Sequence, residues 1–183
     1  MVFFYSPPDC GGGGRQGASL LSEIPLSFAT MANASAGMLM YRRTASGLEV
    51  LLAHPGGPYF VKKDLGGWTI PKGEPEPGEA VEAAAEREFK EETGLPVSGA
   101  RIPLGEIRQK GGKTVYAWAF EGDVPSGFVP TSNDFEMEWP PKSGKRARFP
   151  EIDRAEMFPL EVARAKINAA QAEFLERLVE HLR

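Results

Sequence analysis

Three glutamates near residue 90 have the side-chain type and the spacing of a site for divalent cations. Glu88, Glu91 and Glu92 lie in the segment EREFKEETGL, residues 86–95. Within one helix these carboxylates are about one turn apart, so they repel one another when ionised. The helix dipole also disfavours negative charge near a C-terminal end. Mg²⁺ or Mn²⁺ ions, which bind carboxylate oxygens, offset both costs and promote displacements at phosphorus.

The position of these glutamates around the helix decides between a metal site and a solvated surface. Charge-rich helix faces are more often solvated. At about 100° per residue, however, the three glutamates continue the side formed by Val81, Ala84 and Ala85. We expect this side to pack on a sheet. The sequence therefore favours a metal site over a solvated face.

The surrounding pattern predicts an α/β fold, a mixed sheet between helices in an α/β/α sandwich. One alanine- and glutamate-rich helix is expected from about Glu79 to Thr93, and Gly94 supplies its left-handed C-terminal cap. A second helix is expected in the last segment, residues 159–183. The expected extended segments are GMLMYRR and LEVLLAH as a hairpin, GGWTIP, RIPLGEIRQ, KTVYAWAFEG, FEMEW and EMF, whereas KSGKRAR is expected to be a solvated loop.

The composition is that of one globular domain preceded by a tail. With 183 residues and 42% hydrophobic content, the chain can bury one sizeable core. Residues 1–30 contain SPPDCGGGG, in which proline and glycine oppose regular structure. We therefore expect a disordered tail over residues 1–30 and a single domain over residues 31–183.

Charge and hydropathy argue against several functional classes. A net charge of −4 is unsuited to a general nucleic-acid binder, which needs a basic surface. The sequence has no run of about eighteen apolar residues, so we expect no membrane span. Its single cysteine, Cys10, cannot form an internal disulfide, which favours the cytoplasm. Oligomeric state has no signal in the sequence.

The segment GEPEPGEAVEAAAEREFKEETGL, residues 73–95, resembles the Nudix box. That pattern fixes nine positions at defined spacing, and all nine are filled. The residues at these positions are Gly73, Glu79, Arg87, Glu88, Phe89, Glu91, Glu92, Gly94 and Leu95. The order of expected elements from about Ala36 to Arg183 also resembles the fold of that family.

The resemblance implies a metal-dependent hydrolase that cleaves a pyrophosphate bond in a nucleoside diphosphate linked to another group. It implies that Glu88, Glu91 and Glu92 hold Mg²⁺ or Mn²⁺, with the Gly73 carbonyl as a further ligand. Glu79 and Arg87 are then an orienting pair, a role that suits the planar fork of arginine. The expected partner is a small nucleotide substrate.

A further acid outside the box often serves as general base in this family. Our candidate is Glu151, in FPEIDRAEMF, because its spacing before EMF resembles the position of that acid. Glu136 and Glu138 are the second candidates. For all three the alternative is an exposed surface carboxylate.

Lys72, Arg42 and Trp139 are the candidate substrate contacts. Lys72 directly precedes the box and suits a phosphate, Arg42 belongs to a possible basic rim, and Trp139 could stack on a base. The alternatives are solvated cations and a structural aromatic. His54 and His181 are too far apart in sequence to suggest a metal pair, and we expect packing or surface roles for them.

The form PKG before the box resembles the dinucleoside polyphosphate and diphosphoinositol polyphosphate branches of the family. The most specific expectation is therefore asymmetric cleavage of dinucleoside tetraphosphates. Two alternatives stay open: a house-cleaning pyrophosphohydrolase for nucleoside triphosphates, and a non-catalytic nucleotide sensor.

Overall fold

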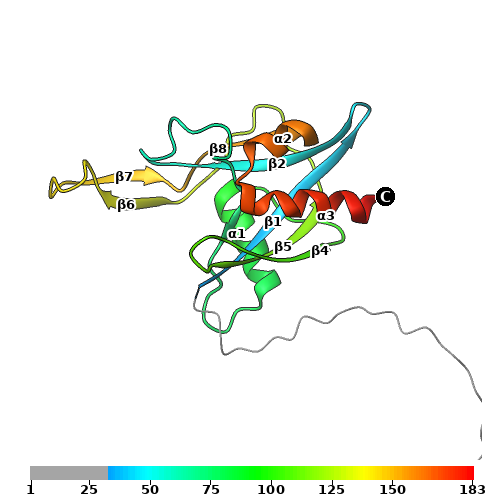
Figure 1. The fold of residues 1–183 in the computed structure, drawn as a ribbon, viewed down its shortest axis with the longest axis horizontal. Helices are drawn as coiled ribbons and strands as arrows, with labels where there is room; N and C mark the ends of the chain where they lie inside the picture. The colour runs from blue at the N-terminus through cyan, green and yellow to red at the C-terminus, as the bar shows by residue number, and fades with distance from the viewer. Residues whose placement is uncertain (1–32) are drawn as a thin grey trace, which may run out of the picture.

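A mixed six-stranded sheet dominates residues 33–183, the part of the chain that the computed structural model describes (Figure 1). The tail expected over residues 1–30 lies outside the described residues. The strand order is β4-β5-β1-β2-β8, and β3 pairs with β1. β1 and β5 run parallel, whereas the other pairs are antiparallel. The strands are β1 (Ala34–Thr44), β2 (Gly47–Pro55), β3 (Lys72–Gly73), β4 (Ile102–Arg108), β5 (Thr114–Glu121) and β8 (Ile152–Pro159).

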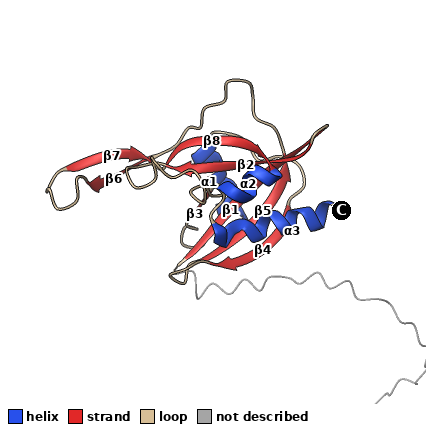
Figure 2. Cartoon of the chain, turned by 45° about the horizontal axis from the view of Figure 1, so that its top comes forward, coloured by secondary structure: helices blue, strands red, loops and turns tan. Residues whose placement is uncertain are grey.

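Helices cover both faces of this sheet (Figure 2). On one face, α1 (Val81–Thr93) buries Ala84, Ala85 and Phe89 against β1 and β2. On the other face, α2 (Leu160–Lys166) and α3 (Ala172–Leu182) bury Ala163, Phe174, Leu175 and Leu178. The expected α/β/α sandwich is thus confirmed. None of these helices is long and apolar enough to span a bilayer.

Helix α1 begins two residues later than predicted and ends where predicted. Ala80 is extended, with φ −67° and ψ 139°, so Glu79 precedes the helix. The carboxylate of Glu79 accepts a hydrogen bond from the amide of Glu76, which closes a turn before the helix. Gly94 adopts the left-handed conformation at φ 75°, and its amide donates to the Lys90 carbonyl.

The single C-terminal helix predicted over residues 159–183 is wrong, because the chain is extended at Ile167. There the backbone pairs with Trp68: the Trp68 amide donates to the Lys166 carbonyl, and the Asn168 amide donates to the Trp68 carbonyl. The side chain of Asn168 then caps a short 3₁₀ turn, Ala169–Gln171, which leads into α3. Helical periodicity continues across the break, so the apolar pattern alone does not reveal it.

The outer edge of β4 is closed by a side chain from α3. Arg177 donates to the carbonyls of Leu104 and Glu106 at 2.7 and 3.0 Å. These carbonyls flank Gly105, where the pairing register shifts and φ is 76°. A Cβ at Gly105 would lie 2.9 Å from the guanidinium. The bulge and the arginine therefore fit only around a glycine.

A separate hairpin of β6 (Asp134–Glu138) and β7 (Arg146–Pro150) projects from the domain (Figure 1). FEMEW was correctly expected to be extended, but the loop expected for KSGKRAR is wrong at Arg146–Arg148, which lie in β7. GGWTIP forms isolated bridges at Trp68 and Thr69 in place of a strand. The charged residues of β7 suggested a solvated loop. In the structure, Arg146 and Arg148 instead pair with Glu136 of the neighbouring strand β6.

Removal of the hairpin should leave the domain folded, because none of the fully buried core residues belongs to it. Asp134 and Pro150 are direct neighbours in the register, so a two-glycine turn can replace residues 135–149. We expect a melting temperature within about 4 °C of the parent protein. A larger drop in calorimetry would show that the hairpin contributes to the core.

Candidate active site

Glu88 lies directly over Gly73, which β3 carries into contact with α1. The short strand β3 is held against β1 by the pairs Ala36–Gly73 and Gly37–Lys72. A Cβ built on Gly73 would lie 1.9 to 2.3 Å from the Glu88 carboxyl atoms. Only glycine allows the carboxylate this position. The first residue of the box is thus explained by a steric requirement.

Glu92 is fixed one turn further along α1 by the backbone of β3. Its Oε2 accepts a hydrogen bond of 2.8 Å from the Lys72 amide. Burial raises the pKa of Glu92 to about 8, although the Lys72 ammonium and this hydrogen bond lower it. The negative charges of Glu88 and Glu151 raise it further. The site therefore lacks positive charge for its ionised form.

Glu88 is mostly buried, with its side chain 14% exposed. Its Oε1 accepts a hydrogen bond of 2.8 Å from Arg87. Burial raises the pKa of Glu88, Arg87 opposes that shift, and Glu91 and Glu151 add to it. Two neighbouring carboxylates, Glu88 and Glu92, thus both resist ionisation.

Glu91 departs from the expectation that it faces the sheet. Its side chain is 42% exposed, and its Oε2 lies 3.4 Å from Arg87 Nη1. The buried side of α1 runs through Ala85, Phe89 and Thr93. Glu91 lies at the edge of that side, so it is on the solvent-exposed side of the pair Glu88 and Glu92.

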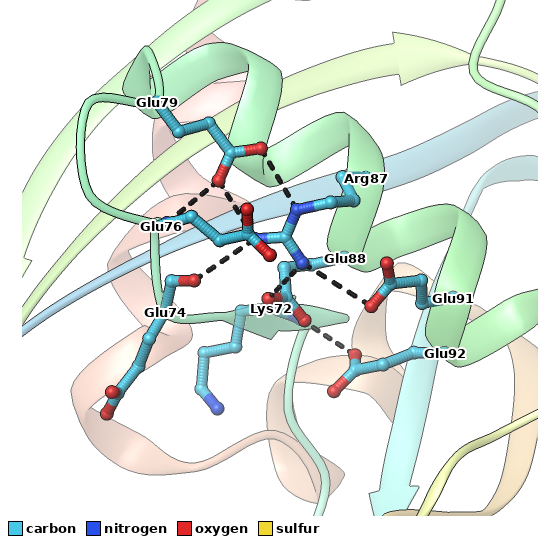
Figure 3. Close-up of polar contacts among 8 residues, drawn as sticks. All are labelled: Lys72, Glu74, Glu76, Glu79, Arg87, Glu88, Glu91 and Glu92. Atoms are coloured by element: carbon cyan, nitrogen blue, oxygen red, sulfur yellow. Dashed lines mark hydrogen bonds and ion pairs between the residues drawn. The ribbon is translucent and has the colours of Figure 1, made fainter.

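Arg87 and Glu79 are brought together in a two-pronged ion pair. Arg87 Nε and Nη2 each lie 2.9 Å from a Glu79 oxygen. Nη2 also donates to the Glu74 carbonyl, next to Gly73. Arg87 therefore ties both ends of the loop between β3 and α1 to Glu88 in one network (Figure 3). This contact lowers the pKa of Glu79 and raises that of Arg87.

Glu151 lies at the junction of β7 and β8, near enough to the acidic pair for its charge to act on both members. Its side chain is exposed, and its charge raises the pKa of both Glu88 and Glu92. Its backbone is held from two sides: the Gly56 amide donates to its carbonyl, and its amide donates to the Asn133 carbonyl. The structure therefore brings this candidate base to the site.

Two lysines stand beside the acids. Lys72 is partly buried, and desolvation lowers its pKa while Glu92 and Glu88 oppose that shift. Lys113, in the β4–β5 turn, lies 2.8 Å from Glu74 and is close enough to repel Lys72. Sequence reasoning missed Lys113 and Glu74, because their proximity depends on the parallel pairing of β5 with β1.

Four other candidates lie away from this cluster. Arg42 pairs with Glu49 and Asp123, and it is five residues, roughly 17 Å, along β1 from Gly37. Trp139 packs edge to face on Tyr59, with ring centroids 5.5 Å apart, at the outer end of the hairpin. Glu136 pairs with Arg146 and Arg148, and Glu138 accepts a bond from the Gly144 amide.

The family model described as NUDIX domain matches residues 31–178. This chain belongs to the Nudix family. With every fixed position of the Nudix box present, it is a pyrophosphohydrolase of that family.

Solved structures share this Nudix fold. A binary complex of *C. elegans* Ap4A hydrolase matches with a TM-score of 0.60 and 23% identity, over 81% of this chain and 97% of that chain. The NUDIX domain of *Shewanella oneidensis* NrtR complexed with ADP ribose matches with a TM-score of 0.59 and 15% identity, over 82% and 88%. The C-terminal domain of mouse MUTYH, in complex with human PCNA, matches with a TM-score of 0.54 and 19% identity, over 81% and 88%.

The donor set of this Nudix site fits a hard divalent cation. Glu88 and Glu92 supply carboxylate oxygens, Gly73 leaves the space that the Glu88 carboxylate occupies, and the Lys72 amide holds Glu92. Their raised pKa values show that negative charge is under-compensated there. Within residues 33–183, no three acidic, histidine or cysteine side chains converge closely enough to form a complete cage. The side chains thus offer a partial set of ligands, which leaves room for water and substrate oxygens.

Gly73→Ala should disable the site, because the added methyl group displaces the Glu88 carboxylate. We expect turnover to fall at least about a hundredfold and Mn²⁺ affinity to fall about tenfold. Calorimetric titration with Mn²⁺ and a hydrolysis assay measure the two effects. Ala83→Ser, on the exposed side of α1, is the control, and a Gly73→Ala protein with unchanged Mn²⁺ affinity would contradict this assignment.

Glu92→Gln should stabilise the metal-free protein near pH 8. The folded state holds a proton on Glu92 up to about pH 8, whereas the unfolded state loses it near the ordinary value of 4.5. The free energy of unfolding therefore falls as pH rises between these values. At pH 8 the variant should gain about 2–4 kcal/mol in urea unfolding with chelator present.

Glu82→Gln, at an exposed position in the first turn of the same helix, should leave this stability unchanged. Equal stability of Glu92→Gln and the parent protein at both pH 5 and pH 8 would show that Glu92 is not strained by burial.

Proposed function

We propose that this enzyme uses Mg²⁺ or Mn²⁺ to hydrolyse a nucleoside diphosphate linked to another group, and that its preferred substrates are dinucleoside tetraphosphates, which it cleaves asymmetrically. The observation that carries the proposal is the pair Glu88 and Glu92 beside Gly73, with two lysines next to it. Carboxylates that hold cations and ammonium groups that meet phosphate oxygens are the parts that such a reaction needs.

Support for the substrate class comes from the positive groups and from one structural relative. Lys72 directly precedes the box, and Lys113 lies beside it, so more than one phosphate can be neutralised in addition to those that contact the metal. The similarity to the Ap4A hydrolase of *C. elegans* extends across nearly all of that protein. A chain of four phosphates suits this extended set of cations.

Held by Glu88, Glu91 and Glu92, divalent ions would polarise phosphate oxygens and lower the pKa of water. The protein holds the remaining parts in place. Arg87 fixes Glu88, Glu79 fixes Arg87, and the Lys72 amide fixes Glu92. These contacts come from backbone and from a planar guanidinium, so the oxygens cannot turn away during the reaction.

Glu151 accepts the proton of the attacking water. The water oxygen forms a bond to phosphorus, the bond from phosphorus to the bridging oxygen breaks, and the leaving phosphate retains the electron pair. Two observations support this role: Glu151 is exposed, and it is near enough to Glu88 and Glu92 for their charges to interact. Glu91, on the solvent side, completes the set of metal ligands that the Nudix box predicts.

The cytoplasm, with its nucleotide pool, is the location that this proposal assigns. Trp139 and Arg42 stay candidates for substrate contact only at the distal parts of a long substrate, because neither lies in the acidic cluster.

A panel of nucleotides incubated with Mg²⁺ in oxygen-18 water tests the proposed substrate. We expect dinucleoside tetraphosphates to give a nucleoside triphosphate and a nucleoside monophosphate, with the label in one of them. Preferred release of pyrophosphate from nucleoside triphosphates would favour the house-cleaning function. Binding without cleavage of any panel member, with Mg²⁺ or Mn²⁺, would establish a sensor in its place.

Glu92→Gln should lower turnover at least about a hundredfold, because one charge that stabilises the transition state is removed while the shape is kept. Steady-state hydrolysis of the preferred substrate measures this effect, and Glu82→Gln is the matched control on the same helix. An unchanged rate would remove Glu92 from the catalytic machinery.

A further inference from the structure

His54 is a fully buried histidine whose two ring nitrogens both face acceptors. It lies in β2 with 0% of its surface exposed. Nδ1 is 2.6 Å from Asp153 Oδ1, and Nε2 is 2.7 Å from the Lys63 carbonyl oxygen. The ring packs edge to face on Trp68, with centroids 5.1 Å apart. The packing role expected from the sequence is confirmed, and the two polar contacts go beyond it.

The Lys63 carbonyl fixes one hydrogen of this ring. A backbone carbonyl cannot donate, so Nε2 must carry a hydrogen to bond Lys63. The Asp153 oxygen that meets Nδ1 also lies 3.4 Å from the guanidinium of Arg154. Both ring nitrogens are thus engaged in short hydrogen bonds, to groups on two different segments of the chain.

Irregular backbone brings Asp153 to His54. The register of β2 with β8 runs from His54–Arg154 to Pro55–Ile152, so Asp153 is an extra residue opposite no partner. A bulge of this kind turns a side chain away from the regular alternation. Here it places the carboxylate against a buried ring. A buried ring nitrogen left without a hydrogen-bond partner is costly, so the arrangement is strongly specified.

Charged groups from three elements surround the ring and its aromatic neighbour. Arg154 of β8 lies over Trp68 at 5.1 Å, and Lys166 of α2 lies over it at 5.4 Å. Asp64 accepts bonds from the Trp68 indole at 3.0 Å and from Lys166 at 2.5 Å. The ammonium of Lys63 lies over Phe60, so this residue meets His54 only through its carbonyl.

The loop that His54 contacts through the Lys63 carbonyl also contacts Glu151, the candidate general base. Gly56, at the start of the loop formed by residues 56–67, donates to the Glu151 carbonyl at 2.9 Å. A Cβ on Gly56 would lie 2.0 Å from the Pro150 carbonyl oxygen, so loop and junction are in close contact. Asp153, the other partner of His54, follows Glu151 by two residues. His54 thus joins both sides of the segment that carries Glu151.

We propose that His54 is a positioning residue for Glu151, acting as a buried ring whose two hydrogen bonds clasp the loop formed by residues 56–67 to the junction of β7 and β8. Loss of the ring leaves the Lys63 carbonyl of the loop without this donor and removes the contact between Asp153 and β2. The Glu151 backbone then moves relative to the acids on α1. The kinetic part of this inference rests on the proposed function, through the role of Glu151.

Nitrogen-15 spectra of the wild-type protein test the clasp without an activity assay. The chain has two histidines, and His181 is exposed at the end of α3, so His181→Gln assigns both sets of signals. We expect Nε2 of His54 to carry the hydrogen that the Lys63 carbonyl accepts. A His54 ring whose Nε2 carries no hydrogen would overturn the proposal.

Hydrogen exchange tests whether the clasp reaches the junction. In His54→Gln, which cannot bond Asp153 and Lys63 in the same way, the amides of Gly56 and Glu151 should exchange about tenfold or more faster, because their local opening becomes easier. His181→Gln should show no change. Protection that is equal in both variants would overturn the proposal. Loss of hydrolysis for every nucleotide would reject the proposed function, yet it would leave this result and the nitrogen-15 result standing.

The kinetic signature separates positioning from general damage. In His54→Gln we expect kcat to fall about tenfold to a hundredfold with KM within about twofold. If that variant does not fold, Asp153→Asn and Asp153→Ala replace it: asparagine keeps an acceptor for Nδ1 and should retain more turnover than alanine. Equal kcat in the parent and in folded His54→Gln, or equal losses for both Asp153 variants, would overturn the proposal.

Discussion

The close approach of Glu88 to Gly73 is the contact on which the site depends. It requires a residue without a side chain on β3, a helix packed tightly above that strand, and a cation that keeps the carboxylate in place. Arg87 meets the last requirement from within the chain, and its fork to Glu79 keeps it there. The residues of the Nudix box therefore act together to hold the Glu88 carboxylate in a mostly buried position, which an ionised group would not otherwise adopt.

Burial of acidic groups has a cost that the fold accepts. Glu92 and Glu88 have raised pKa values, because the sheet and helix remove them from water. The structure offsets part of this cost with the Lys72 amide and with Arg87, and leaves the rest uncompensated. Such residual strain is what gives a site its affinity for a divalent cation.

The sequence predicted what depends on local spacing. The helix end at Gly94 and the sandwich of helices around a mixed sheet follow from local patterns along the chain, and the pairing of Glu79 with Arg87 follows from the resemblance to the Nudix box. What depends on contacts between distant segments was not predictable. The break at Ile167 exists because Trp68 needs backbone partners, and Glu91 faces solvent because the sheet is centred under Ala85 and Phe89. Lys113 and Asp153 reach their partners only through strand pairing and a bulge.

Arg177 opposes aggregation of this protein through the exposed edge of its sheet. An outermost strand with free carbonyls can recruit a strand from another molecule and begin a growing aggregate. On β4, the guanidinium occupies two of those carbonyls, and the bulge at Gly105 bends the strand out of line. A single side chain from the last helix thus blunts this border of the sheet, and it does so only once that helix has docked.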